Sequence, residues 1–373
     1  MFPFRLLPTD NNKIVFYCYN GKGYGDNPKY IAEEIVRQNL PYKLRWIVKG
    51  TGFVFPHDIL PVRIWTLRYI YELATAKIII SNVKNYLPFV KRKNQYFIQT
   101  WHGPLPFKYI EKDAVDLLSP KYVKESQQNS AITDVITSCN SMQSAFFRNS
   151  FWYDGEVLEC GAPRSDIFFS APSVKEELKH KMGVDKGQKI MLYCPTFRDN
   201  GSIDAYSIDA PMILDCLEKK TGCQWVLFVR MHPNDMRGMA RFSYDEHVVN
   251  MTTYPDMQEL LLVADAQITD YSSTIAEFLV MQKPVFIFAS DLDEYSHNCR
   301  GLSKNYFDLP LKINKTNDEL VQAISQYDEA EYKKSIAPYM KRYNSFDDGH
   351  ASERVVERIK SVVNGTFQKP DNQ

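Results

Sequence analysis

Short apolar segments alternate with longer amphipathic segments along most of the chain. Each apolar segment ends in a turn-forming or polar residue, and a segment with helical periodicity follows it. Apolar strands separated by helices are typical of parallel sheets that are covered on both faces. The predicted strands are 14–19, 44–49, 77–81, 96–101, 134–138, 157–160, 189–194, 224–231, 247–251, 266–270 and 284–289. The predicted helices between them are 27–39, 61–76, 120–130, 140–150, 205–220, 256–263 and 273–281.

The alternation is interrupted once, around residues 162–188, by proline-containing and lysine-rich sequence that holds one helix. We therefore predict an α/β protein of two doubly wound, Rossmann-like domains, covering residues 1–170 and 171–373. Residues 315–364 are expected to be helical, and whether the extreme C-terminus packs back on the first domain is left open. Ligands of such sheets bind beyond the carboxyl ends of the strands, here in an expected cleft between the domains.

Charge changes this picture only when it is counted by segment. The 45 basic and 45 acidic side chains of the 373 residues balance, which argues against a surface built to bind nucleic acid. Residues 1–170 nevertheless hold 21 basic and 15 acidic side chains, and residues 171–373 hold 24 and 30. Ten basic side chains lie between Lys43 and Lys93 against two acidic ones. We therefore expect a locally basic surface in the first half and no nucleic acid partner.

Cysteine usage and hydropathy indicate a cytoplasmic protein. The seven cysteines are odd in number and form no C-x-x-C pair, so a disulfide framework or a zinc ribbon is not expected. The first residues lack the basic and apolar regions of a signal peptide, and no run reaches the roughly 18 apolar residues of a membrane span.

A histidine stands at the end of the predicted strand 96–101. His102 is followed by Gly103 and a proline, which stop the strand and leave the imidazole at its carboxyl end. A histidine titrates near neutral pH and can therefore act as a general acid or base. The alternative is a packed histidine that caps a turn.

Two further strand ends carry cations. Arg230 and His232 follow strand 224–231, where alternation would place them on one face as an anion site. A salt bridge with a cap is an equally good interpretation of that pair. Strand 189–194 leads to Thr196, a hydroxyl donor, and to Arg198, which could hold a phosphate through two hydrogen bonds.

A hydroxyl-rich turn follows the predicted strand 266–270. Asp270 ends the strand, and Ser272, Ser273 and Thr274 lead into a helix. Thr274 and Glu277 have the spacing of a capping box, and the free N–H groups of a helix start favour a phosphate. Helix capping alone would also account for the serines.

Other phosphate and metal sites are not indicated. The glycines at 21, 23 and 25 lack the G-x-G-x-x-G spacing and the lysine of a P-loop, which disfavours an NAD or ATP enzyme. Asp291 and Asp293 have the spacing of a metal pair, but no histidine or third carboxylate is near in sequence, so we expect solvated loop acids. We expect no metal site and no tightly bound cofactor.

Nine stretches of the chain have the character of family motifs. They are NGKGYGDNPKYIAEE (20–34), YELATAK (71–77), QTWHG (99–103), GAPRSD (161–166), YCPTFRD (193–199), RMHP (230–233), ITDYSST (268–274), DLDEYSHNCRG (291–301) and DGHASERV (348–355). Together they resemble, over nearly the whole chain and in order, the CDP-glycerol glycerophosphotransferase family of teichoic acid and capsule synthesis.

The resemblance implies a GT-B-type fold and transfer of a polyol phosphate from CDP-glycerol, or from CDP-ribitol, to a hydroxyl, with CMP leaving. The acceptor would be a lipid-linked or polymeric glycan. His102 and His232 match the family's catalytic histidines, while Ser272, Ser273 and Glu277 match its donor-binding segment. Arg300 and Gly301 match its Arg-Gly motif. Pro104 and the following residues depart from the usual sequence after His-Gly, as do the residues after Gly301, which leaves the polyol and the acceptor open.

Two alternative functions and a peripheral membrane location are also compatible with the sequence. The same fold serves nucleotide-sugar glycosyltransferases, and a non-catalytic scaffold in the pathway would also retain it. The basic segment 43–93 contains the predicted helix 61–76 with Arg63 and Arg68. This helix is either a core helix with solvated charges or a surface that contacts anionic lipid, which would place the protein peripherally on the inner face of the cell membrane.

Overall fold

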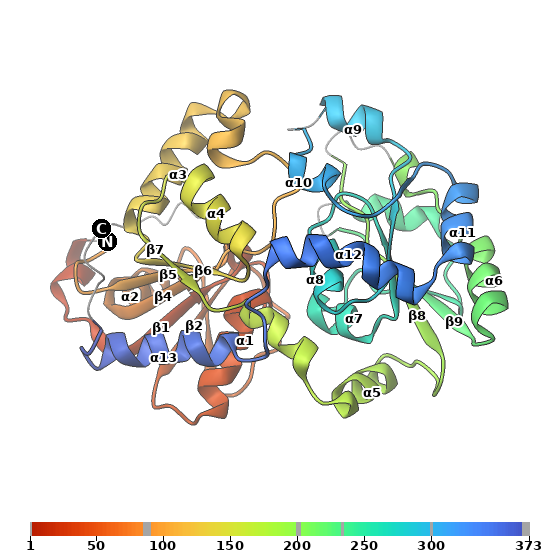
Figure 1. Ribbon diagram of the computed structural model, residues 1–373. Helices are drawn as coiled ribbons and strands as arrows, with labels where there is room; N and C mark the ends of the chain where they lie inside the picture. The colour runs from red at the N-terminus through yellow and green to blue at the C-terminus, as the bar shows by residue number, and fades with distance from the viewer. Residues whose placement is uncertain (1, 85–90, 199–202, 233–234, 299–300, 368–373) are drawn as a thin grey trace. The chain divides into compact units, whose positions relative to one another are not determined.

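The computed structural model describes residues 2–84, 91–198, 203–232, 235–298 and 301–367. The chain forms two compact units, each with its own parallel sheet (Figure 1). Unit 1 comprises Met1–His102, Ile110–Phe169 and Ser345–Gln373, and unit 2 comprises Gly103–Tyr109 and Ser170–Asn344. The segment that directly follows His102 thus belongs to unit 2, whereas the sequence pattern put it in the first domain.

Unit 1 is built on a seven-stranded sheet in the order β3-β2-β1-β4-β5-β6-β7, in which all neighbours are parallel. This order places β1 and β4 at the centre, where strands are most apolar. The strands are β1 (Asp10–Tyr17), β2 (Lys43–Val48), β3 (Ile59–Arg63), β4 (Ala76–Ser81), β5 (Tyr96–Gln99), β6 (Val135–Ser138) and β7 (Glu156–Glu159). The helices of this unit are α1 (Asp26–Arg37), α2 (Leu67–Thr75), α3 (Pro120–Ile132), α4 (Ser141–Ser150) and α13 (Ala351–Val363).

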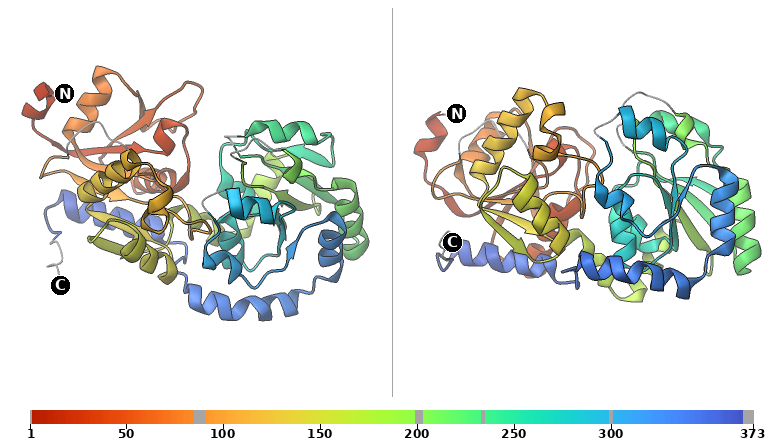
Figure 2. Two further views of the ribbon diagram at one scale, coloured as in Figure 1. Left: turned by 90° about the horizontal axis from the view of Figure 1, so that it is seen from above. Right: turned by 45° about the horizontal axis from the view of Figure 1, so that its top comes forward.

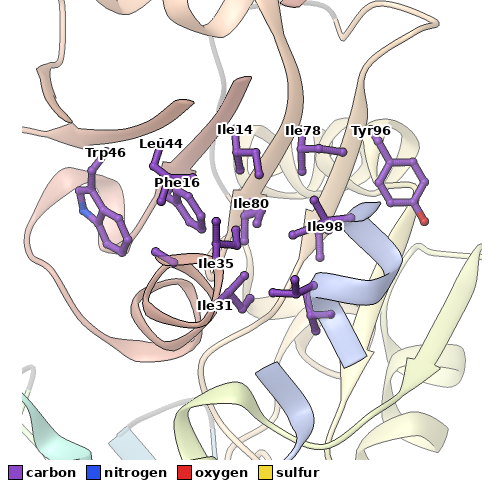
Figure 3. Close-up of a cluster of buried hydrophobic side chains, with 14 of the residues drawn as sticks. Ile14, Phe16, Ile31, Ile35, Leu44, Trp46, Ile78, Ile80, Tyr96 and Ile98 are labelled. Atoms are coloured by element: carbon purple, nitrogen blue, oxygen red, sulfur yellow. The ribbon is translucent and has the colours of Figure 1, made fainter. Parts of the chain in front are cut away.

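The main core of unit 1 lies between one face of this sheet and α1. Figure 3 shows Ile14 and Phe16 of β1 beside Ile78 and Ile80 of β4, with Ile31 of α1 facing them. These five side chains are fully buried. Burying an aliphatic or aromatic side chain of this size contributes about 1.5–3 kcal/mol, so this layer fixes the sheet against its helix.

The last helix, α13, is part of unit 1 and lies beside α1 (Figures 1 and 2). Its residues Val355 and Ile359 are fully buried in the same core. The Asp166 carboxylate accepts hydrogen bonds from the backbone N–H groups of Ala351 (2.9 Å) and Ser352 (2.7 Å). Asp166 therefore caps the start of α13 and joins the GAPRSD segment to the DGHASERV segment.

The predicted helix 61–76 is wrong in its first turns. The segment instead forms the edge strand β3 and then α2, which begins only at Leu67. Pro61 is tolerated in β3 because an edge strand leaves backbone N–H groups outside the ladder. Trp65 adopts a positive φ of 65°, and the Thr66 side chain accepts a hydrogen bond from Tyr69 N at the start of the helix. The apolar character of both segments concealed the turn between them.

Unit 2 is built on a six-stranded parallel sheet in the order β10-β9-β8-β11-β12-β13. The short strand β13 was not predicted. The strands are β8 (Lys189–Tyr193), β9 (Trp225–Val229), β10 (Val248–Asn250), β11 (Ala266–Thr269), β12 (Val285–Phe288) and β13 (Ile313–Asn314). The helices are α5 (Pro172–Lys181), α6 (Ala210–Thr221), α7 (Met257–Val263), α8 (Thr274–Val280), α9 (Leu292–Asn298), α10 (Lys304–Phe307), α11 (Asn317–Gln326) and α12 (Glu329–Tyr343).

The core of unit 2 joins one face of its sheet to α6 and α11, which lie side by side (Figure 2). Met191 of β8 and Leu227 of β9 meet Ile213 of α6 and Leu320 of α11, and all four are fully buried. The strands end at the edge of this sheet from which the loops with Thr196, Arg230 and Asp270 emerge. In the described part of the chain, no helix combines the length and the apolar character that crossing a membrane requires.

Candidate functional site

His102 follows β5 in unit 1, and its imidazole is held by a backbone carbonyl. Nδ1 lies 2.8 Å from the carbonyl oxygen of Asn82, which follows β4, the neighbour of β5. Because a carbonyl oxygen can only accept, Nδ1 carries the proton and the neutral ring presents Nε2 as its base. The Trp101 ring (4.3 Å between centroids) and the edge of Tyr19 (5.8 Å) flank the imidazole.

Burial keeps this imidazole neutral near pH 7. Burial lowers the pKa of His102, the Asp26 carboxylate and the Asn82 carbonyl oppose this effect, and the Arg164 guanidinium adds to it. The net pKa lies below the ordinary value of 6.5. A neutral imidazole with a fixed Nδ1 proton is the form that a general base requires.

Asp26 and Arg164 form a buried ion pair beside His102, and the sequence analysis assigned no role to either. Arg164 Nη1 lies 2.7 Å from Asp26 Oδ2 and 2.8 Å from the carbonyl oxygen of His102. The Asn27 side chain donates to the carbonyl oxygens of Thr100 (3.2 Å) and Trp101 (3.1 Å). The motifs at 20–34, 99–103 and 161–166 therefore converge on one histidine.

In unit 2, Asp270 ties two loops together at the carboxyl edge of the sheet. Its Oδ1 accepts hydrogen bonds from the backbone N–H of Thr196 (2.8 Å), after β8, and of Tyr271 (2.6 Å), after β11. The Thr269 hydroxyl donates to the carbonyl of Cys194 at 2.7 Å and repeats the link. The structure thus brings the predicted residues Thr196 and Asp270 together.

Arg198 does not stand open to a phosphate as the sequence suggested. Its guanidinium is 4% exposed, donates to both Asp291 oxygens (2.6 and 3.0 Å) and lies 2.8 Å from Asp270 Oδ2. It also donates to the carbonyl of Thr196 at 2.5 Å. Burial lowers the pKa of Arg198, but the two carboxylates outweigh burial and raise it overall. Arg198 is therefore a buried cation that two carboxylates hold in place.

Aromatic rings enclose this ion triad. The Arg198 guanidinium carbon lies 5.1 Å from the ring centroid of Tyr271 and 4.9 Å from that of Tyr295, and these two rings stack at 3.9 Å.

Asp291 is a partner of Arg198, so the expectation that Asp291 is a solvated loop acid was wrong. Across the described ranges, no group of three or more histidine, cysteine or acidic side chains has the arrangement of a metal site.

Arg230 and His232 contact different neighbours. Both lie beyond β9, which ends at Val229, so strand alternation no longer sets their directions. Arg230 Nη1 donates to the carbonyl of Tyr254 (2.6 Å), beyond β10, whereas the His232 ring lies 4.7 Å from that of Phe197, beyond β8. These contacts come from the loops after β10 and β8, and the joint role of the two side chains at an anion stays a prediction.

The capping box predicted at Thr274 and Glu277 is not formed. Ser273 is the N-cap of α8, and its side chain makes no capping hydrogen bond. The Thr274 hydroxyl accepts from Gln267 Nε2 at 2.8 Å and donates to Ser272 Oγ at 3.0 Å. Glu277 is buried, and its carboxylate accepts from Gln258 Nε2 at 3.0 Å, because the helix turns it toward α7.

Gly103 and Gly301 fit close to other parts of unit 2. A Cβ atom at Gly103 would lie 3.2 Å from Ser273 Oγ, so the absence of a side chain allows this turn to approach α8. Gly301 has a φ of 75°, and its carbonyl accepts from Tyr109 N at 3.4 Å. Arg300, predicted with Gly301, lies outside the described residues.

Solved structures of known proteins share the fold of this chain. The wall teichoic acid polymerase TagF superimposes with a TM-score of 0.85 at 28% identity, covering 96% of this chain and 91% of that one. A variant of TagF has also been solved after soaking with CDPG. The fold is therefore of the GT-B type, as predicted.

The sequence relatives agree. A teichoic acid poly(glycerol phosphate) polymerase of Bacillus spizizenii is 28% identical over 371 residues, which cover 95% of this chain and 93% of that protein. One of Staphylococcus epidermidis is 30% identical over 365 residues, covering 94% of this chain but only half of that longer protein. The model of the CDP-glycerol:poly(glycerophosphate) glycerophosphotransferase family matches residues 1–361. The chain belongs to this family, which confirms the family and the enzyme class expected from its motifs.

Proposed function

We propose that this protein transfers glycerol phosphate from CDP-glycerol to a hydroxyl of a lipid-linked or polymeric acceptor in teichoic acid synthesis, releasing CMP. The observation that carries the proposal is the state of His102, a neutral imidazole with its Nδ1 proton bound to Asn82 and Nε2 as the available base. Membership of the glycerophosphotransferase family supports the choice of donor.

The chemistry follows from these groups. His102 Nε2 takes the proton of the acceptor hydroxyl as its oxygen attacks the β-phosphorus of CDP-glycerol. The bond between that phosphorus and the bridging oxygen breaks, and the electron pair leaves with CMP. Arg230, His232 and the hydroxyls of Ser272, Ser273 and Thr274 are proposed to hold the diphosphate and stabilise the charge that passes to CMP. No step of this scheme uses a resident cofactor.

A donor comparison tests this function. The protein is incubated with a poly(glycerol phosphate) acceptor and, separately, with CDP-glycerol, CDP-ribitol and UDP-N-acetylglucosamine, and the released nucleotide is identified by chromatography. We expect acceptor-dependent release of CMP from CDP-glycerol. Release of UDP from the sugar nucleotide, with no CMP from either CDP-polyol, would instead identify a glycosyltransferase. CMP from CDP-ribitol alone would change the polyol but keep the reaction class.

We further propose that unit 1 contacts an anionic membrane through the connection between β3 and α2. Trp65 and Leu67 are 73% and 75% exposed there, and Arg63 and Arg68 flank them. An aromatic and an aliphatic side chain between cations are suited to the interface of an anionic bilayer, where each cation contributes about 1 kcal/mol. Such contact would bring the enzyme to a lipid-linked acceptor.

Vesicle sedimentation tests the membrane contact. We expect the protein to bind phosphatidylglycerol vesicles at low salt and to lose binding as sodium chloride increases, because salt screens the cations. Trp65→Ser combined with Leu67→Ser should weaken binding several-fold. Leu117→Ser, which removes another exposed leucine of unit 1 (67% exposed), is the control and should bind as the wild type does. Binding that is absent or insensitive to salt would contradict the proposal.

A further inference from the structure

Five residues of unit 1 form a closed ring of hydrogen bonds that begins and ends at His102. Both side chains and backbone groups take part in it. His102 Nδ1 donates to the Asn82 carbonyl, and the Asn82 side-chain oxygen accepts from Tyr19 N at 2.9 Å. The Tyr19 hydroxyl donates to Asp26 Oδ2 at 2.5 Å. The Arg164 guanidinium closes the ring, since one nitrogen donates both to Asp26 Oδ2 and to the carbonyl oxygen of His102. The ring therefore fixes the backbone and the imidazole of the same residue.

The ring draws on strained backbone from separate segments. Tyr19, in the 3₁₀ turn after β1, has a φ of 43°, Asp26 at the start of α1 has 58° and Trp101 beside His102 has 53°. A positive φ is unfavourable for residues with side chains, particularly aromatic ones, and costs on the order of 1–3 kcal/mol. Strain of this kind persists only where surrounding contacts determine the conformation. The ring supplies such contacts to Tyr19 and Asp26, and Asn27 and Gln99 supply them to the backbone of Trp101.

The ring also places a carboxylate and a guanidinium, paired with each other, beside the histidine. The Asp26 and Arg164 side chains are 4% and 7% exposed, so solvent screens them weakly. Asp26 raises the pKa of His102, and Arg164 lowers it. Burial and the Asp26 charge raise the pKa of Tyr19 well above 10, so its hydroxyl stays protonated and keeps donating. Asp26, Arg164 and the Asn82 carbonyl thus act on the pKa of the imidazole, and the Tyr19 ring lies 5.8 Å from it.

We propose that Asp26, Tyr19 and Arg164 are positioning residues that fix the tautomer and the electrostatic environment of the His102 imidazole. Asp26 is the central member, because it is bonded to both of the others. This inference rests on the proposed role of His102 as the general base. It gives Asp26, Tyr19 and Arg164 a role in setting the state of that base.

The inference predicts pH effects of opposite sign. A base is active when deprotonated, so kcat/KM rises with pH through the pKa of His102. Asp26→Asn removes a negative charge, which lowers this pKa and moves the rise to lower pH. Arg164→Gln removes a positive charge and moves the rise to higher pH. Tyr19→Phe, which keeps the ring but loses the hydroxyl, should lower kcat by up to about a hundredfold through misplacement while leaving KM for CDP-glycerol unchanged.

A matched control separates charge from general loss of stability. Glu72→Gln neutralises another carboxylate of unit 1 that is also 4% exposed and paired, at 2.8 Å from Lys13 Nζ. This variant should lose stability but leave the pH profile in place. If Asp26→Asn and Arg164→Gln shift the profile in the same direction, or no further than Glu72→Gln does, then either the ring does not tune His102 or His102 is not the base, and titration of the imidazole itself decides between the two.

Titration of the His102 imidazole by NMR distinguishes this inference from the proposed function. The resonance is assigned by its loss in His102→Asn, and its midpoint is followed in the full-length wild type and in both charge variants. Opposite shifts of the midpoint support the ring even if the kinetic profile fails to follow them, in which case the proposed base role is wrong. Midpoints that do not move overturn the ring, whatever the activity shows.

Discussion

Replacing His102 with alanine will lower kcat for CMP release from CDP-glycerol by about 10²–10⁴-fold, the range that one general base contributes. The imidazole is neutral, its Nδ1 proton is bound to Asn82 and its Nε2 is the available base, so alanine removes the proton acceptor outright. KM for CDP-glycerol should change little, because the base acts on the acceptor hydroxyl. Nucleotide release under saturating acceptor measures both constants.

Two histidine variants complete this test. His57→Ala removes a fully exposed histidine of the same unit and should retain wild-type turnover. His232→Ala is expected to lower kcat in the same range, since this side chain is proposed to stabilise the charge that passes to CMP. Near-normal turnover of both His102→Ala and His232→Ala would refute the assignment of the two residues.

Arg198→Met will destabilise the protein by about 3–5 kcal/mol, the cost of leaving buried carboxylates without their cation. Asp270 and Asp291 both depend on this guanidinium, and their side chains are 3% and 16% exposed. Because the triad also joins the loops after β8 and β11, KM for the donor should increase. Urea denaturation followed by circular dichroism measures the first effect, and initial rates measure the second.

The surface offers the matched control for this prediction. Arg241 pairs with Asp204, but the two side chains are 35% and 86% exposed, so Arg241→Met should cost no more than about 1 kcal/mol. Adding Asp291→Asn to Arg198→Met should recover part of the lost stability by removing one unpaired charge. If Arg198→Met were as stable as Arg241→Met, the triad would not hold these loops.

The elements of both sheets were largely predictable because continuous apolar strands and amphipathic helices leave clear patterns. The failures have local causes. The strand β3 and the helix α2 are both apolar, and the turn at Trp65 contains no glycine to mark it. The strand β13 has only two residues, too few to show a period.

The chemistry at the strand ends was predictable only in part. His102 was found because it follows a strand directly, but Asp26 and Arg164 lie 76 and 62 positions away from it, and only the fold brings them together. Arg198 illustrates the opposite case. A cation at a strand end has the same sequence pattern whether it holds a phosphate or a buried carboxylate, and the partner, Asp291, is 93 positions away.

The central claim is that the bond between the β-phosphorus and the bridging oxygen of the donor breaks, so that the β-phosphate travels with glycerol to the acceptor. CDP-glycerol labelled with ³²P at the β-phosphorus tests it most directly, with the label followed into nucleotide and polymer after incubation with the acceptor. We predict that the label enters the acceptor in a phosphodiester and that the released CMP is unlabelled. Labelled CDP, with no label in the acceptor, would contradict the account.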